Sequence, residues 1–388
     1  MSTYLSKILD RILENTNTTT NKGIIVASPS TEPPYKYHWI RDSALVMRVL
    51  IDMYKKTKDS KYFEYIINYI ENEIKVQELD TISGLGEPKI NIDCSPYNGE
   101  WGRPQNDGPA LRSIMMLKIL NIFKYKYESI IKRMIIPIIM NDLNYILENY
   151  NKPSFDIWEE QNGWHFYTRM VQFKFLKDTI NNKKDLELNE ELLKKIEQTY
   201  KELSISIKDH FGVDGDNGTI ISSFNKDGEI IKYEDSANIL AFCHIDFDKD
   251  ILEIVPLDNL LHTINNLLDY FRNKYGDNDL NLIGRYKDDK YYGGQIWIIC
   301  SLALAQTYLE LYIQRNKSIK RGHMERAASN PNNDLYLFAN NILERILSLD
   351  VDFILPEQFD PNNSKYYSAK KLTWNYSELY ILINNLEL

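Results

Sequence analysis

The chain has 388 residues, of which 43% are hydrophobic and 26% charged, and its formal net charge is −9. This composition is typical of a folded protein with a sizeable core, and the negative charge argues against a nucleic-acid binder, which normally carries a basic face. Three cysteines without C-x-x-C spacing and six scattered histidines predict neither a disulfide framework nor a metal site. We therefore expect no metal, no cofactor and no nucleic-acid partner.

The first predicted element is an amphipathic helix over residues 2–14. Its apolar side holds Leu5, Ile8, Leu9, Ile12 and Leu13. It lacks the continuous apolar stretch and small-residue cleavage site of a signal peptide, and no segment of the chain approaches 18 uncharged apolar residues, the length that spans a membrane. We expect no membrane partner and a cytoplasmic or otherwise not classically secreted chain.

Helices dominate the rest of the chain, because apolar residues recur with the 3.6-residue spacing of amphipathic helices. They are predicted near residues 42–57, 60–76, 107–124, 127–149, 164–180, 190–210, 234–243, 256–275, 292–315, 333–349 and 373–386. Strand signals are few: residues 219–223 and 229–232 predict one small hairpin around a turn at 225–228. The polar segment 316–333 is predicted to be a surface loop.

About twelve helices in hairpin pairs fit two architectures. An α-solenoid should show a repeat of about 34–47 residues, whereas a closed toroid wraps six inner helices with six outer ones. No repeat is visible, and the loops are unequal. We therefore predict an all-α (α/α)6 toroid with one small β-hairpin. Because no Ser/Thr/Pro-rich linker interrupts the chain, residues 1–388 are expected to form a single domain.

Five short polar segments between the predicted helices combine tryptophan, arginine and carboxylates, and function concentrates on such loops. They are residues 35–42 (YKYHWIRD), 84–109 (GLGEPKINIDCSPYNGEWGRPQNDGP), 155–163 (FDIWEEQNG), 284–297 (GRYKDDKYYGGQIW) and 355–360 (LPEQFD).

Two of these segments hold candidate acid–base groups. Repulsion between Glu159 and Glu160, together with desolvation by the Trp158 ring, would raise a carboxyl pKa, as a general acid requires near neutral pH. A charged helix start is the alternative. Glu357, which follows an apolar run and a proline, is either a second functional acid or a surface residue. Glycosidic bond hydrolysis needs such a pair, one acid protonating the leaving oxygen and one carboxylate on the opposite ring face.

Arginine–aspartate pairs occur in two of the segments, as Arg41–Asp42 and as Arg285 with Asp289. Such pairs are suited to gripping vicinal sugar hydroxyls in bidentate fashion. A structural ion pair that closes a loop is an equally good interpretation, and the sequence leaves both open.

In this order, the five segments resemble the conserved blocks of fungal glucoamylases, glycoside hydrolase family fifteen. The most specific match is G-L-G-E-P-K-I-N-I-D followed by W-G-R-P-Q-N-D-G-P-A-L-R, and the resemblance extends from residue 35 to residue 374. It implies an (α/α)6 barrel with the site at one end. It also implies an exo-acting, inverting glucan 1,4-α-glucosidase that releases β-glucose from the non-reducing ends of maltooligosaccharides, starch or glycogen.

The resemblance assigns roles residue by residue. Glu159 matches the general acid, and Glu357 matches the general base that activates water. The positions that match substrate-binding residues are Tyr35, Arg41, Asp42, Trp101, Glu160, Arg285 and Trp297. The positions that match supporting residues are Trp39, Asp289, Tyr291 and Trp374, of which Asp289 is expected to support Arg285 rather than to touch sugar.

The chain departs from the family pattern at Glu100 and at residues 294–296, and both departures bear on the outer subsites. No starch-binding module is expected, and the protein is expected to be a monomer. Two alternatives stay open. One is the same fold acting on α-1,6-glucans or trehalose, and the other is a non-catalytic, glycan-binding regulatory module.

Overall fold

The computed structural model describes residues 2–16, 21–211, 218–245, 254–320, 331–349 and 352–386. Within these ranges, six helices form an inner ring in which each helix packs against the next. They are α2 (Ile40–Thr57), α4 (Gly108–Phe123), α7 (Phe166–Asn181), α9 (Ala237–His244), α12 (Ile298–Lys320) and α14 (Thr373–Leu386). The last of them, α14, packs against α2, which closes the ring and excludes an open solenoid.

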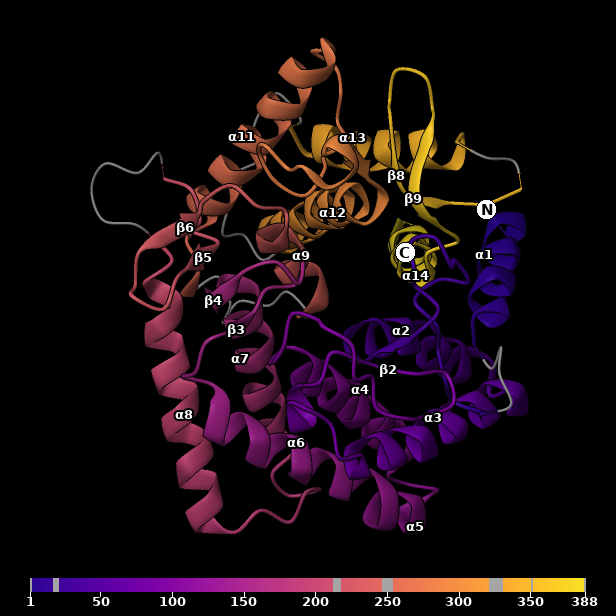
Figure 1. The fold of residues 1–388 in the computed structure, drawn as a ribbon, viewed down its shortest axis with the longest axis vertical. Coiled ribbons are helices and arrows are strands. Elements are labelled where there is room, and N and C mark those ends of the chain that lie inside the picture. Colours follow the sequence, from indigo (N-terminus) through magenta and orange to yellow (C-terminus); the bar gives the residue numbers. More distant parts are fainter. Residues whose placement is uncertain are drawn as a thin grey trace.

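An outer helix packs against each inner helix. The outer helices are α1 (Ser2–Glu14) on α14, α3 (Ser60–Glu78) on α2, α6 (Ile136–Asn149) on α4, α8 (Glu190–Lys208) on α7, α11 (Leu257–Tyr275) on α9 and α13 (Pro331–Leu347) on α12. The chain passes once around the molecule, with the outer helices toward the periphery (Figure 1). The arrangement is the predicted (α/α)6 toroid.

Burial differs between the two layers because the inner helices are enclosed on all sides. Helix α4 buries nearly its whole circumference, including Arg112, whose guanidinium pairs with Asp142 of α6 and Glu73 of α3. Outer helices bury one stripe, as expected for amphipathic helices. In α1 the predicted apolar side is the packed one, and Ile8 and Ile12 are fully buried.

Three small antiparallel sheets each include one strand that directly precedes an inner helix: β1 before α2, β4 before α7 and β7 before α12. The first sheet pairs β1 (His38–Trp39) with β2 (Lys89–Ile90). The second contains β3 (Ser154–Phe155), β4 (Asn162–His165), β5 (Ser223–Phe224) and β6 (Ile230–Lys232), and the third contains β7 (Ile296–Trp297), β8 (Pro356–Phe359) and β9 (Tyr366–Lys370). The predicted hairpin at 219–232 is thus part of a four-stranded sheet, with its first strand shifted to Ser223–Phe224. The segment 355–360, predicted to be a loop, contains strand β8.

Two predicted helices have different boundaries in the structure. The helix predicted over 127–149 is divided into α5 (Glu128–Ile130), a π-helical turn (Ile131–Ile135) and α6. Pro137, which has no N–H to donate to the preceding turn, accounts for the altered hydrogen bonding. The helix predicted over 292–315 begins only at Ile298, because Gly293 and Gly294 adopt positive φ angles of 79° and 61°.

The segment 316–333, predicted to be a loop, is only partly described. Residues 316–320 extend α12, and residues 331–333 begin α13. The remainder, 321–330, lies outside the described residues.

Candidate active site

All five predicted segments contribute to one cavity of about 430 Å³. Twelve of the thirteen predicted site residues line it: Tyr35, Trp39, Arg41, Asp42, Trp101, Glu159, Glu160, Arg285, Tyr291, Trp297, Glu357 and Trp374. The remaining one, Asp289, lies behind Arg285. The cavity lies where α2, α12 and α14 begin, so the ring of helices brings together segments that are far apart in the sequence.

Glu159 lies in the tight turn that joins β3 to β4. Its φ angle is +67°, in the left-handed region that few non-glycine residues adopt. Asp156 holds this turn together. Its Oδ1 atom accepts hydrogen bonds from the backbone N–H groups of Glu160 (2.8 Å) and Gln161 (3.1 Å), and its backbone oxygen accepts from the N–H of Glu159 (2.9 Å). Lys232, 3.3 Å away, balances the charge of Asp156.

Four donors from two other segments, 35–42 and 84–109, surround the Glu159 carboxylate. Its Oε1 atom accepts from Trp39 Nε1 at 2.7 Å, from Gln105 Nε2 at 3.1 Å and from Arg41 Nη2 at 3.4 Å. Its Oε2 atom accepts from Trp101 Nε1 at 2.8 Å. Since four donors converge on its two oxygens, the carboxylate has a fixed orientation at the cavity.

Both sequence neighbours of Glu159 have polar partners of their own. The indole N–H of Trp158 turns to Asp235, at 2.9 Å from Oδ1, and Glu160 forms an ion pair with Arg285 at 2.8 Å. The tight turn thus directs consecutive side chains to different partners.

A buried cation lies behind two of the rings that hold Glu159. The Nζ atom of Lys89 is 3.1 Å from the ring centroid of Trp101 and 4.5 Å from that of Trp39. Tyr97 and Tyr37 complete the aromatic cage at 4.3 Å and 4.5 Å. Burial lowers the pKa of Lys89 to about 8, although the negative charge of Glu159 acts in the opposite direction.

Glu357 approaches the cavity from strand β8 and is 2% exposed. Burial raises its pKa to about 7, against hydrogen bonds from Ser368 and Tyr35 and the charge of Arg285, which favour the ionised form. Ser368, on the neighbouring strand β9, donates its hydroxyl to Glu357 Oε2. Its Oγ atom also lies 3.1 Å from Tyr291 Oη, which in turn lies 3.1 Å from Tyr35 Oη.

Arg41 and Asp42 occupy the first turn of α2, inside the cavity. Arg41 Nη1 donates to Gln105 Oε1 and Asp107 Oδ2, both at 2.9 Å, while its Nε atom is 3.7 Å from Asp42. Burial raises the pKa of Asp42 to about 7, although the positive charge of Arg41 lowers it. The negative charges of Glu159 and Asp107 act in the same direction as burial. The Asp42 carboxyl is therefore a buried acceptor at the cavity wall.

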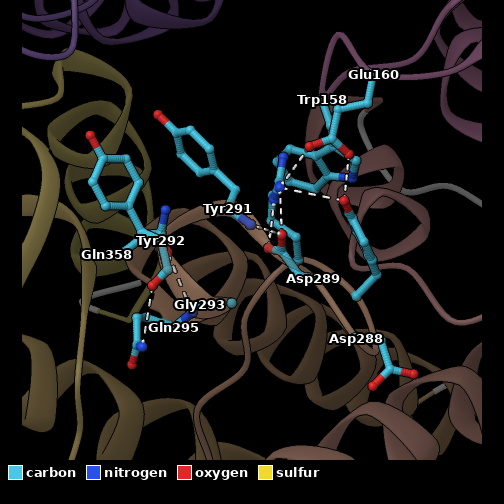
Figure 2. A network of polar contacts seen from close by, with 12 residues as sticks. Trp158, Glu160, Asp288, Asp289, Tyr291, Tyr292, Gly293, Gln295 and Gln358 are labelled. Atoms are coloured by element: carbon cyan, nitrogen blue, oxygen red, sulfur yellow. Dashed lines mark hydrogen bonds and ion pairs between the residues drawn. The ribbon is translucent and has the colours of Figure 1, made fainter.

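Arg285 is held by two carboxylates from different segments. Its Nε and Nη2 atoms donate to Asp289 at 2.8 Å and 2.6 Å, in a bidentate ion pair that corresponds to the structural alternative left open by the sequence. Glu160 and Asp289 converge on this guanidinium, and the N–H of Tyr291 also donates to Asp289 (Figure 2). The rings of Tyr291 and Trp297 lie 5.2 Å and 5.0 Å from the guanidinium carbon. Asp289 thus holds the Arg285 guanidinium in place.

Several residues that shape the site were not singled out from the sequence. Gln105 and Asp107 lie in the W-G-R-P-Q-N-D-G-P match, where the motif itself was the available signal. Lys89 lies in the G-L-G-E-P-K match. Asp156 and Ser368 gave no signal, because their importance comes from the turn geometry and from strand pairing.

Among the described residues, no three His, Cys, Asp or Glu side chains are grouped as metal ligands would be. None of the helices in the described ranges has the length and apolarity needed to cross a membrane.

An (α/α)6 toroid with two carboxylic acids in an aromatic, arginine-lined cavity at one end of its inner helices defines a glycoside hydrolase of the helical-barrel class. The chain belongs to the family described as "Glycosyl hydrolases family 15", whose model matches residues 2–384.

Known proteins agree with this assignment. The chain is 29% identical to Glucoamylase-1 of Arthroderma benhamiae, over 96% of this chain and 66% of that one. It is 26% identical to "Glucoamylase, intracellular sporulation-specific" of Saccharomyces cerevisiae, over 92% of this chain and 77% of that one. Among solved structures, the family 15 glucoamylase of Hypocrea jecorina superposes with a TM-score of 0.87 at 28% identity. The superposition covers 100% of this chain and 72% of that one. The chain spans about two thirds of the first relative.

Proposed function

We propose that this glycoside hydrolase is an exo-acting, inverting glucan 1,4-α-glucosidase, with Glu159 as general acid and Glu357 as general base. The observation that carries the proposal is that both carboxylates, from distant parts of the sequence, line one cavity together with Arg41, Asp42 and Arg285. The names of the relatives, all glucoamylases, support the substrate class.

In the proposed reaction, Glu159 gives its proton to the glycosidic oxygen as the bond to the anomeric carbon breaks. A water molecule attacks that carbon from the opposite face and loses a proton to Glu357, so the released glucose has the β configuration. Oε2 is the better proton carrier on Glu159, because among the described residues it accepts one hydrogen bond and Oε1 accepts three. Inversion requires room for the water, and we expect the carboxyl groups to lie about 6.5–9.5 Å apart.

The hydroxyls of the terminal glucose need fixed partners in this scheme. We assign them to Arg41, Asp42, Glu160 and Arg285, with the rings of Tyr35, Trp101 and Trp297 as the apolar walls. The support is that these side chains line the cavity and that the two arginines are already fixed by Asp107 and Asp289. Sugar binding therefore costs little side-chain entropy at these positions.

Exo action is tested with maltopentaose labelled at its reducing end. We expect unlabelled glucose and labelled maltotetraose as the first products. Labelled maltose or maltotriose among the first products would show internal cleavage and overturn the proposal. Rates on maltose, isomaltose and trehalose separate the α-1,4 activity from the two substrate alternatives. A wild-type protein that binds maltotriose without cleaving it would favour the non-catalytic alternative.

We also propose that the described toroid acts as one catalytic domain and as a monomer, within the cell. Contacts of α14 with α1 and α2 complete the ring inside one chain, so no second copy is needed to form the cavity. The name of the Saccharomyces cerevisiae relative, an intracellular glucoamylase, supports the location. Light scattering and cell fractionation test these two points, and a stable dimer or a secreted product would contradict them.

A further inference from the structure

A carboxylate that the proposed reaction does not use, Glu378, is fully buried one helical turn beyond the active cavity. Glu378 lies four residues after Trp374 on α14, so the two side chains share one face of the helix. The Trp374 ring lines the cavity, whereas Glu378 does not. The indole Nε1 atom donates to Glu378 Oε1 at 2.8 Å. The edge of the ring is therefore tied to a group behind the cavity wall.

Glu378 has an unusual number of donors for a residue that the proposed reaction does not use. Arg48 of α2 donates to Oε1, and Gln306 of α12 donates to Oε2 at 2.8 Å. His244 of α9 lies 3.4 Å from Oε1. Burial alone would raise the pKa of Glu378, but the charge of Arg48 and the hydrogen bonds hold it below its usual range. The carboxylate thus connects four inner helices through one acceptor.

The charge of this group has a structural reason. A carboxylate offers acceptors on both oxygens, whereas a neutral amide would present an N–H group to one of the donors. The guanidinium of Arg48 is also occupied by the backbone oxygens of Leu45 at 3.0 Å and Cys243 at 3.3 Å. Since both partners are held on several sides, the position of Glu378 Oε1 is fixed relative to α2, α9 and α12.

The same residues connect the active cavity with a second one. Arg48 and Gln306 line a cavity of about 360 Å³ together with Tyr380, which lies six residues after Trp374 on α14. The helices α2, α12 and α14 begin at the active cavity and reach the second cavity in their later turns. The Arg48–Glu378 pair therefore lies between the two, inside the ring.

We propose that Glu378 is a positioning residue of the active site, which fixes the Trp374 ring as part of the sugar-binding wall. The inference rests on the proposed function for its sugar ligand, and on the hydrogen bonds of Trp374 and Arg48 for its geometry. Glu378 acts through Trp374 and does not itself touch substrate.

The test compares two variants in which the buried ion pair is absent. Removing one partner alone would leave an unpaired buried charge and risk unfolding, so both variants carry Arg48→Met. One adds Glu378→Gln, which keeps an acceptor for the Trp374 N–H, and the other adds Glu378→Met, which removes it. Thermal unfolding measures whether the two are equally folded.

Two readouts follow Trp374 itself. Maltose binding is measured by calorimetry in a Glu357→Gln background, where turnover does not interfere, and we expect about tenfold weaker binding with Glu378→Met than with Glu378→Gln. Acrylamide quenching of tryptophan fluorescence, without sugar, should be stronger with Glu378→Met. Both differences should vanish when Trp374→Phe is added.

Equal maltose binding and equal quenching in the two variants would overturn the proposal. Differences that persist in the Trp374→Phe background would overturn it too, since they would then arise from the general packing of the inner helices. A wild-type chain that releases no glucose from maltotriose would contradict the proposed function alone. The quenching comparison would still decide whether Glu378 holds Trp374.

Discussion

Glu357 is a carboxylate whose burial favours its protonated form. Its folded-state pKa of about 7 lies above the ordinary value of 4.5. The stability contributed by the protonated form is complete below pH 4.5 and is lost as the pH rises through about 7. The group therefore costs about 3 kcal/mol of folding free energy above pH 7. A functional site that opposes stability in this way is expected of a catalytic carboxyl.

Glu357→Gln should consequently separate stability from activity. We expect the free energy of unfolding to exceed that of the wild type by about 3 kcal/mol at pH 8 and to be nearly equal at pH 4.5. Turnover should fall by about 10²–10⁴-fold. Denaturant titrations at the two pH values measure the difference. A stability gain of the same size at both would show that the carboxyl does not titrate as described.

Ser368 tunes the same carboxyl through its hydroxyl. Because its hydrogen bond favours the ionised form of Glu357, Ser368→Ala should raise the pKa of Glu357. The acidic limb of the kcat/KM profile should then move to higher pH, since the base works ionised. Ser364→Ala is the matched control. Ser364 is an exposed serine in the same hairpin, and its φ of 57° is close to the 62° of Ser368. Identical profiles for both variants would rule out this role.

Lys89 offers a test of the aromatic cage. Its pKa is depressed by burial to about 8, so the folded state disfavours the charge and stability should rise between pH 8 and pH 10.5. Lys89→Met should unfold at a higher temperature at pH 7, yet lose about tenfold in kcat/KM as Trp39 and Trp101 loosen around Glu159. Lys126→Met, at an exposed lysine 5.1 Å from the ring of Tyr127, is the control. Unchanged kcat/KM in Lys89→Met would contradict this role.

At the scale of elements, the β3–β4 turn determines where the acid lies. Asp156→Ala would remove the acceptor for two backbone N–H groups and release the left-handed conformation of Glu159. We expect kcat to fall by about 10- to 100-fold, with a smaller change in KM, because the turn positions the proton donor more than the sugar.

The control for this turn lies in the same sheet. Asn225 Oδ1 accepts from the N–H groups of Asp227 and Glu229, both at 2.9 Å, in the β5–β6 turn, and does not line the cavity. Asn225→Ala should leave kcat and KM unchanged. If it lowered kcat as much as Asp156→Ala, loosening of the sheet would explain both results.

The helices were predictable from the sequence, and the strands mostly were not. Burial of one stripe imposes the 3.6-residue period on the outer helices, whereas an enclosed inner helix such as α4 is buried on nearly all sides. Strands of two residues, such as His38–Trp39 and Ser154–Phe155, are too short to show alternation. Strand β8 was missed because all four of its residues are buried, so its polar positions Glu357 and Gln358 face no solvent.

At the scale of the whole molecule, closure of the ring explains why motifs that are distant in the sequence meet at one cavity. Twelve predicted residues, eleven from the five segments and Trp374 from the start of α14, line one cavity because inner helices begin at the same end. What the motifs lacked was the supporting set. Asp156, Ser368 and Glu378 act through pairings across the ring or across a hairpin, and such non-local contacts leave no local pattern.

The most direct test of the two-carboxylate mechanism is the anomeric form of the glucose released from maltotriose, followed by proton NMR faster than mutarotation. Water delivered by Glu357 opposite to Glu159 predicts that β-glucose appears first and that α-glucose accumulates only later. If α-glucose appeared first, the two carboxyls would be acting through a covalent intermediate with retention, and the proposed roles would be wrong.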